Sequence, residues 1–157
     1  MIKLINFIDL TLEEKKMVLL WRNHKEIKQW MYNTDDISIE NHLKFIESLK
    51  NAIDKLYFLV KQDNEYIGVI DFTNITNKSS DFGLYSNVDL KGAGKILLEN
   101  ICNYAFNTLK LEILKAEVFG DNEKAIYLYK KFNFQEIDKK IVNNKKVICM
   151  ELKYENR

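Results

Sequence analysis

A glycine-bearing segment in the middle of the chain has the residue types of an anion-binding turn. The segment Leu90–Lys95, with the sequence LKGAGK, separates a run typical of a strand from a run typical of a helix. Glycines let the backbone approach a ligand closely, and the free amides and dipole of the following helix favour a negative group such as a diphosphate. Lys91 and Lys95 would add positive charge. The structural alternative is a helix that simply starts at glycines, and these residues alone leave both interpretations open.

Two well-known phosphate-binding loops can be compared with this segment directly. A Walker A loop requires Ser or Thr after its Gly-Lys pair, but Ile96 follows Gly94 and Lys95. A dinucleotide-binding fingerprint requires a third glycine where this chain has Leu97. The sequence therefore excludes both loops.

A second segment of interest begins at Asn122 and is predicted to be a short helix. Asn122 is a suitable N-cap, and Ala125, Leu128 and Tyr129 follow at the spacing of one helix face. Taken alone, this pattern predicts an amphipathic helix with an aromatic core residue.

Arg22 is unusual because the chain strongly prefers lysine. Of 24 basic residues only Arg22 and Arg157 are arginines, and Arg157 is the last residue. A guanidinium is suited to bidentate contacts with a phosphate or carboxylate. Arg22 is therefore a candidate for substrate contact, and a structural ion pair is the alternative. His42 is either a satisfied histidine on a helix surface or a donor to a diphosphate.

Composition limits the classes of function. A formal charge of +1 argues against a dedicated duplex-DNA binder, and 46% apolar residues rule out wholesale disorder. No apolar run is long enough to span a membrane, and the N-terminus lacks the pattern of a signal peptide. Cys102 and Cys149 are expected to be buried thiols in a reducing cytoplasm, and no residues have metal-ligand spacing.

The hydrophobic pattern predicts one mixed α/β domain over residues 1–157, with a βαβ unit in its middle. Thr11 and Glu14 form a capping box, and Ser38 is a predicted N-cap. A helical crossover implies that the strands at 81–85 and 114–119 are parallel. The predicted strands are 2–8, 56–61, 66–74, 81–85, 114–119, 134–137 and 146–153. The predicted helices carry residues 17–21, 27–31, 43–53, 96–109 and 122–131, and the last hairpin turns at 143–144.

The order of these features resembles the GNAT acyltransferase superfamily. That family has Gln/Arg-x-x-Gly-x-Gly/Ala before a helix, and Asp89–Gly94 matches both glycines but has Asp89 at the first position. The later Asn-x-x-Ala-x-x-x-Tyr pattern, from Asn122 to Tyr129, completes the resemblance, which covers nearly the whole chain. It implies a mixed, mostly antiparallel sheet with a splayed parallel strand pair and flanking helices. It also implies acetyl-CoA as co-substrate and no metal.

The resemblance assigns roles to particular residues. The diphosphate of acetyl-CoA would lie on the amides of Lys91, Gly92, Ala93, Gly94 and Lys95. The pantetheine arm would follow the strand that contains Leu84 and Tyr85, and Asn122 and Tyr129 would complete the cofactor site.

Tyr129 corresponds to the family's general acid for the leaving thiolate. The pKa of an ordinary phenol is about 1.5 units above that of a thiol, so full proton transfer from the phenol to the thiolate would cost about 2 kcal/mol. We therefore expect Tyr129 to donate a hydrogen bond to the sulfur, or to have a lowered pKa.

The N-terminal half resembles one branch of the superfamily more closely. Trp21–His24, Trp30-Met31, Phe58–Val60, Ile67–Phe72 and Phe82–Tyr85 are similar to the acetyltransferases of bacterial pseudaminic-acid biosynthesis, a pathway of flagellin glycosylation. Those enzymes acetylate the 4-amino group of UDP-4-amino-4,6-dideoxy-N-acetyl-β-L-altrosamine. The resemblance implies a nucleotide-sugar substrate contacted by Arg22, His42, Thr76 and Lys78.

Several alternatives remain open on the sequence alone. Asp71, Asp81 and Glu117 lie on predicted central strands, and each is a candidate general base. The acceptor could instead be a protein N-terminus, as in ribosomal-protein acetyltransferases. The chain could also be a CoA-binding module without turnover. A homodimer through a sheet edge or the closing hairpin is compatible with the sequence.

Overall fold

A seven-stranded sheet runs through the whole molecule. The computed structural model describes all residues from 1 to 157, and its strand order is β1-β2-β3-β4-β5-β7-β6. All neighbouring strands are antiparallel except β4 and β5, which are parallel. The predicted GNAT-like sheet is therefore confirmed. The strands are β1 (Ile2–Asn6), β2 (Leu56–Gln62), β3 (Glu65–Thr73), β4 (Ser79–Ser86), β5 (Ile113–Phe119), β6 (Gln135–Val142) and β7 (Lys145–Lys153).

Five α-helices flank the sheet, and four of them begin at a side-chain cap. The predicted capping box of Thr11 and Glu14 starts α1, and the predicted caps Ser38 and Asn122 start α3 and α5. The helices are α1 (Leu12–Asn23), α2 (Lys25–Lys28), α3 (Ile39–Ser48), α4 (Ala93–Asn103) and α5 (Glu123–Lys131). A π-helical turn, Tyr104–Thr108, extends α4 and accounts for the predicted helix to residue 109.

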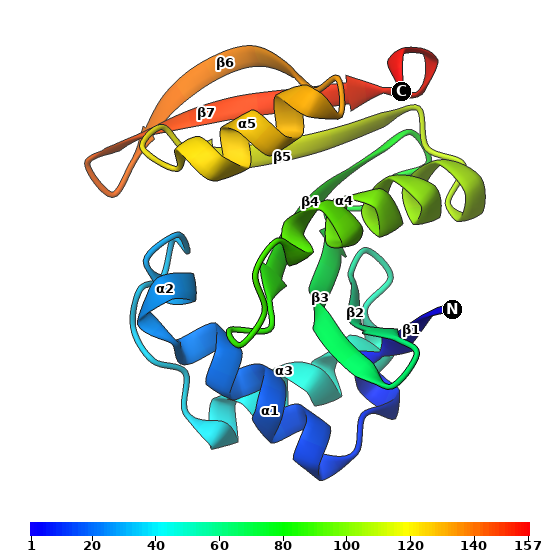
Figure 1. Ribbon diagram of the computed structural model, residues 1–157, viewed down its shortest axis with the longest axis vertical. Coiled ribbons are helices and arrows are strands. Elements are labelled where there is room, and N and C mark those ends of the chain that lie inside the picture. The colour runs from blue at the N-terminus through cyan, green and yellow to red at the C-terminus, as the bar shows by residue number, and fades with distance from the viewer.

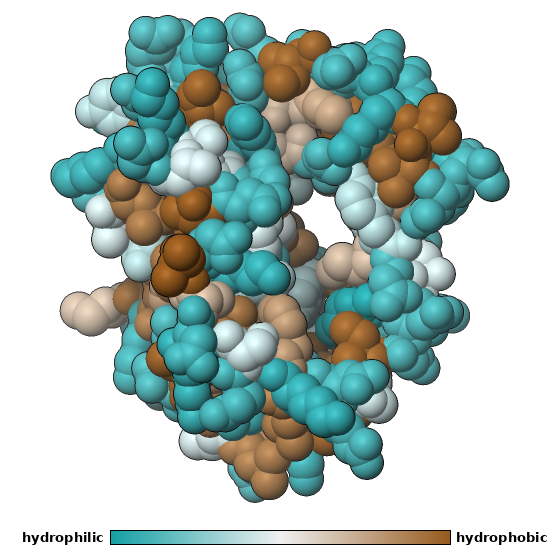
Figure 2. All heavy atoms as spheres, turned by 180° about the vertical axis from the view of Figure 1, so that it is seen from behind, coloured by the Kyte–Doolittle hydropathy of each residue, from teal (hydrophilic) through white to brown (hydrophobic).

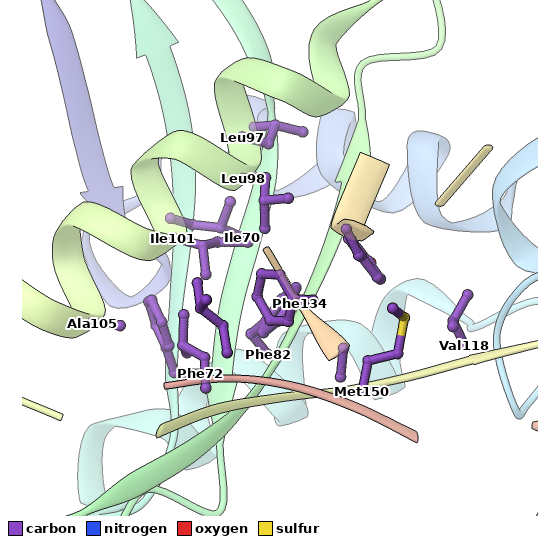
Figure 3. Packing of buried hydrophobic residues seen from close by; sticks show 14 of the residues in the cluster. Ile70, Phe72, Phe82, Leu97, Leu98, Ile101, Ala105, Val118, Phe134 and Met150 are labelled. Atoms are coloured by element: carbon purple, nitrogen blue, oxygen red, sulfur yellow. The ribbon is translucent and has the colours of Figure 1, made fainter. Parts of the chain in front are cut away.

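Two hydrophobic cores lie on opposite faces of the sheet. Helices α4 and α5 cover one face, and α1 and α3 cover the other (Figure 1). On the α4 side, Leu98 and Ile101 point toward Ile70 on β3 (Figure 3). Because successive strand residues point to opposite faces, Val69 belongs to the smaller core with α1 and α3.

The sheet opens between β4 and β5. These strands pair only from Ser79 with Ile113 to Asp81 with Lys115. Beyond Asp81, β4 continues to Ser86 without β5 as a partner, so the strands diverge toward the loop before α4 (Figure 1). This divergence divides the molecule into an N-terminal half, with β1–β4, α1 and α3, and a C-terminal half, with β5–β7 and α5. The expected splayed pair is present.

A few predicted boundaries were wrong. The first strand ends at Asn6, where a 3₁₀ turn begins, and α2 ends before Trp30. Ile53 lies beyond α3 and is exposed, so it does not share the buried face of that helix. The strand predicted at 134–137 extends to Val142, because Asn143 and Asn144 both adopt the left-handed conformation of a tight hairpin turn. No helix is long and apolar enough to cross a membrane.

Candidate active site

A cleft of about 1030 Å³ occupies the divergence between the two halves. Residues of α2 and the turn after it, the end of β4, the loop before α4 and the start of α5 line this cleft. In the space-filling view, an opening passes through the molecule in this region (Figure 2). The cleft can therefore be reached from both sides of the sheet.

The N-terminus of α4 forms one wall of the cleft and has free hydrogen-bond donors. Gly92 is the N-cap, has a φ of +74°, and makes no side-chain capping bond. A Cβ at Gly92 would meet no atom within 4 Å, so the space above the turn is open. No acidic side chain lies in the first turn of α4, and the dipole of this helix therefore favours an anion. Lys91, Gly92, Ala93 and Gly94 all line the cleft.

Gly94 serves a different purpose from Gly92. It is already helical, and a Cβ there would lie 3.2 Å from Leu128 Cδ2 on α5. The missing side chain thus lets the start of α4 approach α5 closely. The two glycines of the motif have distinct physical reasons: one adopts a left-handed turn and the other permits helix packing.

Tyr129 is placed at the wall of the cleft opposite the end of β4. Its ring packs edge-on against Phe82 and also contacts Phe134, and only 8% of the residue is exposed. Its hydroxyl has no partner within the protein and is not fully enclosed, so it is available to a ligand in the cleft. Burial, with a smaller effect from Asp71, raises the pKa of Tyr129 above its usual value. The alternative of a lowered pKa is therefore wrong, and a hydrogen-bond donor remains.

Four further residues predicted to bind the cofactor differ in their placement. Leu84 and Asn122 line the cleft, and Asn122 also accepts a hydrogen bond from the amide of Ala125. The side chain of Tyr85 lies on the opposite face of the sheet, with the α1 core. The Lys95 side chain lines a separate groove of about 760 Å³ between α4 and α5. For Tyr85 and Lys95, only the backbone remains a candidate contact.

Arg22 organises a loop and does not line the cleft. Its guanidinium donates to the backbone oxygens of Asn33, at 2.7 Å, and Asp35, at 3.5 Å. The residue is 9% exposed, and it forms no salt bridge with a carboxylate. These two donors hold the loop after α2, and the predicted contact of Arg22 with a substrate stays a prediction.

His42, Thr76 and Lys78 also lie away from the cleft. His42 is buried on α3, where its Nε2 lies 2.8 Å from the oxygen of Lys15, and burial lowers its pKa. Thr76 accepts hydrogen bonds from the amides of Lys78 and Ser79 in the turn before β4. That turn adjoins the paired end of β4, opposite the end at the cleft. These three residues therefore do not line the cleft at the glycine turn, and their predicted contacts with a nucleotide-sugar stay a prediction.

The loop that follows α2 closes one side of the opening. Tyr32, after α2, donates a hydrogen bond to Glu117 on β5, and its ring packs edge-on against Phe119. Asn143, in the β6–β7 turn, donates to the oxygen of Tyr32 at 2.9 Å. We call residues 30–36 the bridging loop, because they connect the two halves. Contacts across 85 and 111 residues of sequence give no local signal that could reveal them.

Glu117 and Asp81, two of the three candidate bases predicted on the strands, are engaged in polar contacts. Glu117 accepts hydrogen bonds from Tyr32 and, at 2.7 Å, from Lys140. Burial alone would raise the pKa of Glu117, but these two donors bring it below its usual value. Asp81 accepts a hydrogen bond from Asn74 at 2.8 Å. Glu117 therefore does not have the environment of a base near neutral pH.

The cysteines are unpaired, and no cluster of residues could hold a metal ion. Burial raises the pKa of Cys102 to about 12, and burial together with Glu117 raises that of Cys149. Both are therefore thiols at neutral pH, which makes them poor nucleophiles.

Comparison with known proteins identifies the family. Residues 21–134 match the Acetyltransferase (GNAT) family, and this range contains the glycine turn and the Tyr129 helix. The chain belongs to the GNAT acetyltransferase family.

The relatives of this acetyltransferase agree with that assignment. It is 51% identical to acetyltransferase PseH of Campylobacter jejuni serotype O:2 over 138 residues, which are 88% of this chain and 87% of the relative. The crystal structure of C. jejuni N-acetyltransferase PseH in complex with acetyl coenzyme A matches with a TM-score of 0.83 and 42% identity, over 98% of this chain and 99% of that one. A spermidine N-acetyltransferase from Vibrio cholerae, in complex with CoA and spermine, has a TM-score of 0.87 over 99% and 96% of the two chains. At 18% identity, that likeness concerns the fold alone.

Proposed function

We propose that this acetyltransferase transfers the acetyl group of acetyl-CoA to the 4-amino group of UDP-4-amino-4,6-dideoxy-N-acetyl-β-L-altrosamine. The observation that carries the proposal is the 51% identity with PseH over most of both chains, together with the matching fold. The reaction belongs to pseudaminic-acid biosynthesis and thereby to flagellin glycosylation. Because acetyl-CoA and UDP-sugars are cytoplasmic metabolites, we assign the reaction to the cytoplasm.

The donor site is supported by the chemistry of the cleft. The uncapped N-terminus of α4, with Gly92 in its left-handed turn, offers backbone amides to a diphosphate. Lys91 and Lys124 add positive charge at the rim of the same cleft. The apolar side chains of Leu84 and Leu128 are suited to the pantetheine arm. In this arrangement the thioester lies near the Tyr129 hydroxyl.

The diverging strands support direct attack of an amine on the thioester. Backbone groups of β4 beyond Asp81 have no partner on β5, so an amide there is free to bind the acetyl oxygen. Such a donor stabilises the negative charge that develops on this oxygen as the amine attacks. Tyr129 then donates a hydrogen bond to the departing sulfur. Holding donor and acceptor in line within one cleft supplies much of the remaining rate.

The acceptor has an approach separate from that of the donor. The opening through the molecule allows an amine to come from the side covered by α1 and α3. Tyr32 and Lys140, which meet at Glu117, offer polar groups near that side. Arg22 and His42 support the acceptor side through their backbone contacts in α1, α3 and the bridging loop.

The test is an acetylation assay with three kinds of amine. Purified protein is incubated with acetyl-CoA and either the UDP-4-amino sugar, spermidine or a peptide with a free N-terminus. Release of CoA thiol is followed, and mass spectrometry and NMR locate the new amide. We expect rapid acetylation of N4 of the sugar only. Preferential acetylation of the peptide or of spermidine would refute the proposed acceptor, and tight CoA binding without turnover would indicate a non-catalytic module.

A further inference from the structure

Asp71 lies beside the divergence of the sheet, on the side from which the acceptor would enter. It is on β3, directly opposite Gly83 of β4, and Gly83 is two residues past the last β4–β5 pair. Opposite residues of antiparallel strands share a face, and Val69, two residues before Asp71, belongs to the core with α1 and α3. The carboxylate therefore lies one strand from the opening, on the face opposite to α4 and α5.

Gly83 makes room for this carboxylate. A Cβ at Gly83 would lie 2.7 Å from Oδ2 of Asp71 and 3.2 Å from Oδ1. Gly83 does not have a positive φ, so its role is the close approach of the Asp71 side chain to the β4 backbone. The missing side chain thus lets the carboxylate lie against the β4 backbone at a point where β4 has β3 as a partner but no longer has β5.

The surroundings of Asp71 contain phenols and no paired cation. Tyr57 of β2 faces it, and Tyr85 and Asp81 lie on the same face of β4. Tyr129 of α5 is within range of its charge, and Arg22 of α1 interacts with Tyr85. Burial raises the pKa of Asp71 from 3.8 to about 7, with the Gly83 amide acting in the opposite direction. At neutral pH this group can therefore both accept and release a proton.

We propose that Asp71 is the general base that removes the proton from the acceptor ammonium, an inference that rests on the proposed amine acetylation. Its carboxylate takes one proton, and the nitrogen lone pair then forms the C–N bond with the thioester carbon. The C–S bond breaks, the nitrogen loses its second proton, and the sulfur leaves as a thiol with one proton. The balance is one acetamide, one CoA thiol and one proton released to solvent.

The first experiment compares pH profiles of kcat/KM for the acceptor that the wild-type chain acetylates. We expect the wild-type rate to rise through an apparent pKa near 7, because the base must be ionised. Asp71→Asn should lower kcat about a hundredfold and abolish that inflection. Gly83→Ala should also lower kcat, because its Cβ displaces the carboxylate. If Asp71→Asn retains the inflection while Asp81→Asn or Glu117→Gln abolishes it, the assignment to Asp71 is wrong.

A second experiment is independent of turnover, so it separates failure of the base from failure of the proposed function. The carboxyl carbon of Asp71 is titrated by ¹³C NMR, with Asp71→Asn identifying its signal. A midpoint near 7 is expected, and a midpoint below 5 would overturn the proposal. Asp71→Asn should also raise Tm at pH 8, where the native carboxylate is ionised and desolvated, and this gain should vanish below about pH 4.

Discussion

Tyr129 combines a fixed ring with a free hydroxyl. Phe82 and Phe134 hold the ring from two sides, while no group of the protein uses the hydroxyl. Its raised pKa makes complete proton transfer to a thiolate more costly than for an ordinary tyrosine. The hydroxyl is better suited to a hydrogen bond that strengthens as charge develops on the sulfur.

Tyr129→Phe removes only this hydroxyl. We expect kcat to fall about a hundredfold, because the leaving sulfur loses its donor. The ring packing is preserved, so the Kd for CoA should change less than threefold in calorimetric titrations. Unchanged kcat in the variant would eliminate the proposed role of the hydroxyl.

Arg22 has a structural role in the bridging loop. Its contacts with the oxygens of Asn33 and Asp35 fix the bridging loop to the end of α1. Arg22→Ala should lower the free energy of unfolding by about 2 kcal/mol, because the carbonyls of Asn33 and Asp35 lose a charged donor from a buried side chain. Urea unfolding measures this loss. The Kd for CoA should stay unchanged, since the donor cleft does not include Arg22. A large loss of CoA affinity with full stability would contradict this assignment.

At the scale of elements, the sequence predicted what local patterns determine. The caps at Thr11, Ser38 and Asn122 and the parallel β4–β5 pair were confirmed, because short-range spacing and a helical crossover specify them. The direction of Tyr85 was not predicted, because the face of a strand residue depends on register with its neighbours.

In the candidate site, too, local patterns were predictable and contacts between distant segments were not. The cleft includes Leu84, Lys91–Gly94, Asn122 and Tyr129, and this agrees with the predicted cofactor region. That these residues bind the cofactor stays a prediction. The substrate residues were harder to predict, because Arg22 and His42 bond to backbone oxygens that come from other segments. The bridging loop depends on contacts between distant parts of the chain, and no local pattern encodes them.

The start of α4 provides a test at this scale. In Gly92→Ala, the new methyl group enters the open space above the turn. An alanine at this positive φ also strains the backbone by about 1 kcal/mol. CoA affinity should fall at least tenfold by calorimetry. The control is Gly120→Ala, whose Cβ would make only ordinary contacts with Lys146 and lies outside the cleft. Equal CoA affinities for the two variants would show that the turn is not the diphosphate site.

At the scale of the whole molecule, two halves are joined where the sheet is paired and again through the bridging loop. Between these connections lies the opening seen in Figure 2. Donor and acceptor can thus enter from opposite faces and meet where β4 lacks a partner. The divergence is the feature that allows both substrates to reach one point.

The contact of Tyr32 with Glu117 tests the second connection. Tyr32→Phe removes the hydroxyl but keeps the ring against Phe119. Amides of the bridging loop should exchange several-fold faster with deuterium, corresponding to about 1 kcal/mol, while amides of the β2–β3 core stay unchanged. Uniform acceleration across the protein would instead mean that the bond contributes only to global stability.

The central claim is that the turn before α4 holds the diphosphate of the donor and directs its thioester toward Tyr129. A crystal structure of this chain with CoA tests it most directly. We predict diphosphate oxygens within hydrogen-bond distance of the amides of residues 92–95 and the sulfur next to the Tyr129 hydroxyl. A coenzyme bound in the groove of Lys95 and Cys102, with no anion at the turn, would contradict the claim.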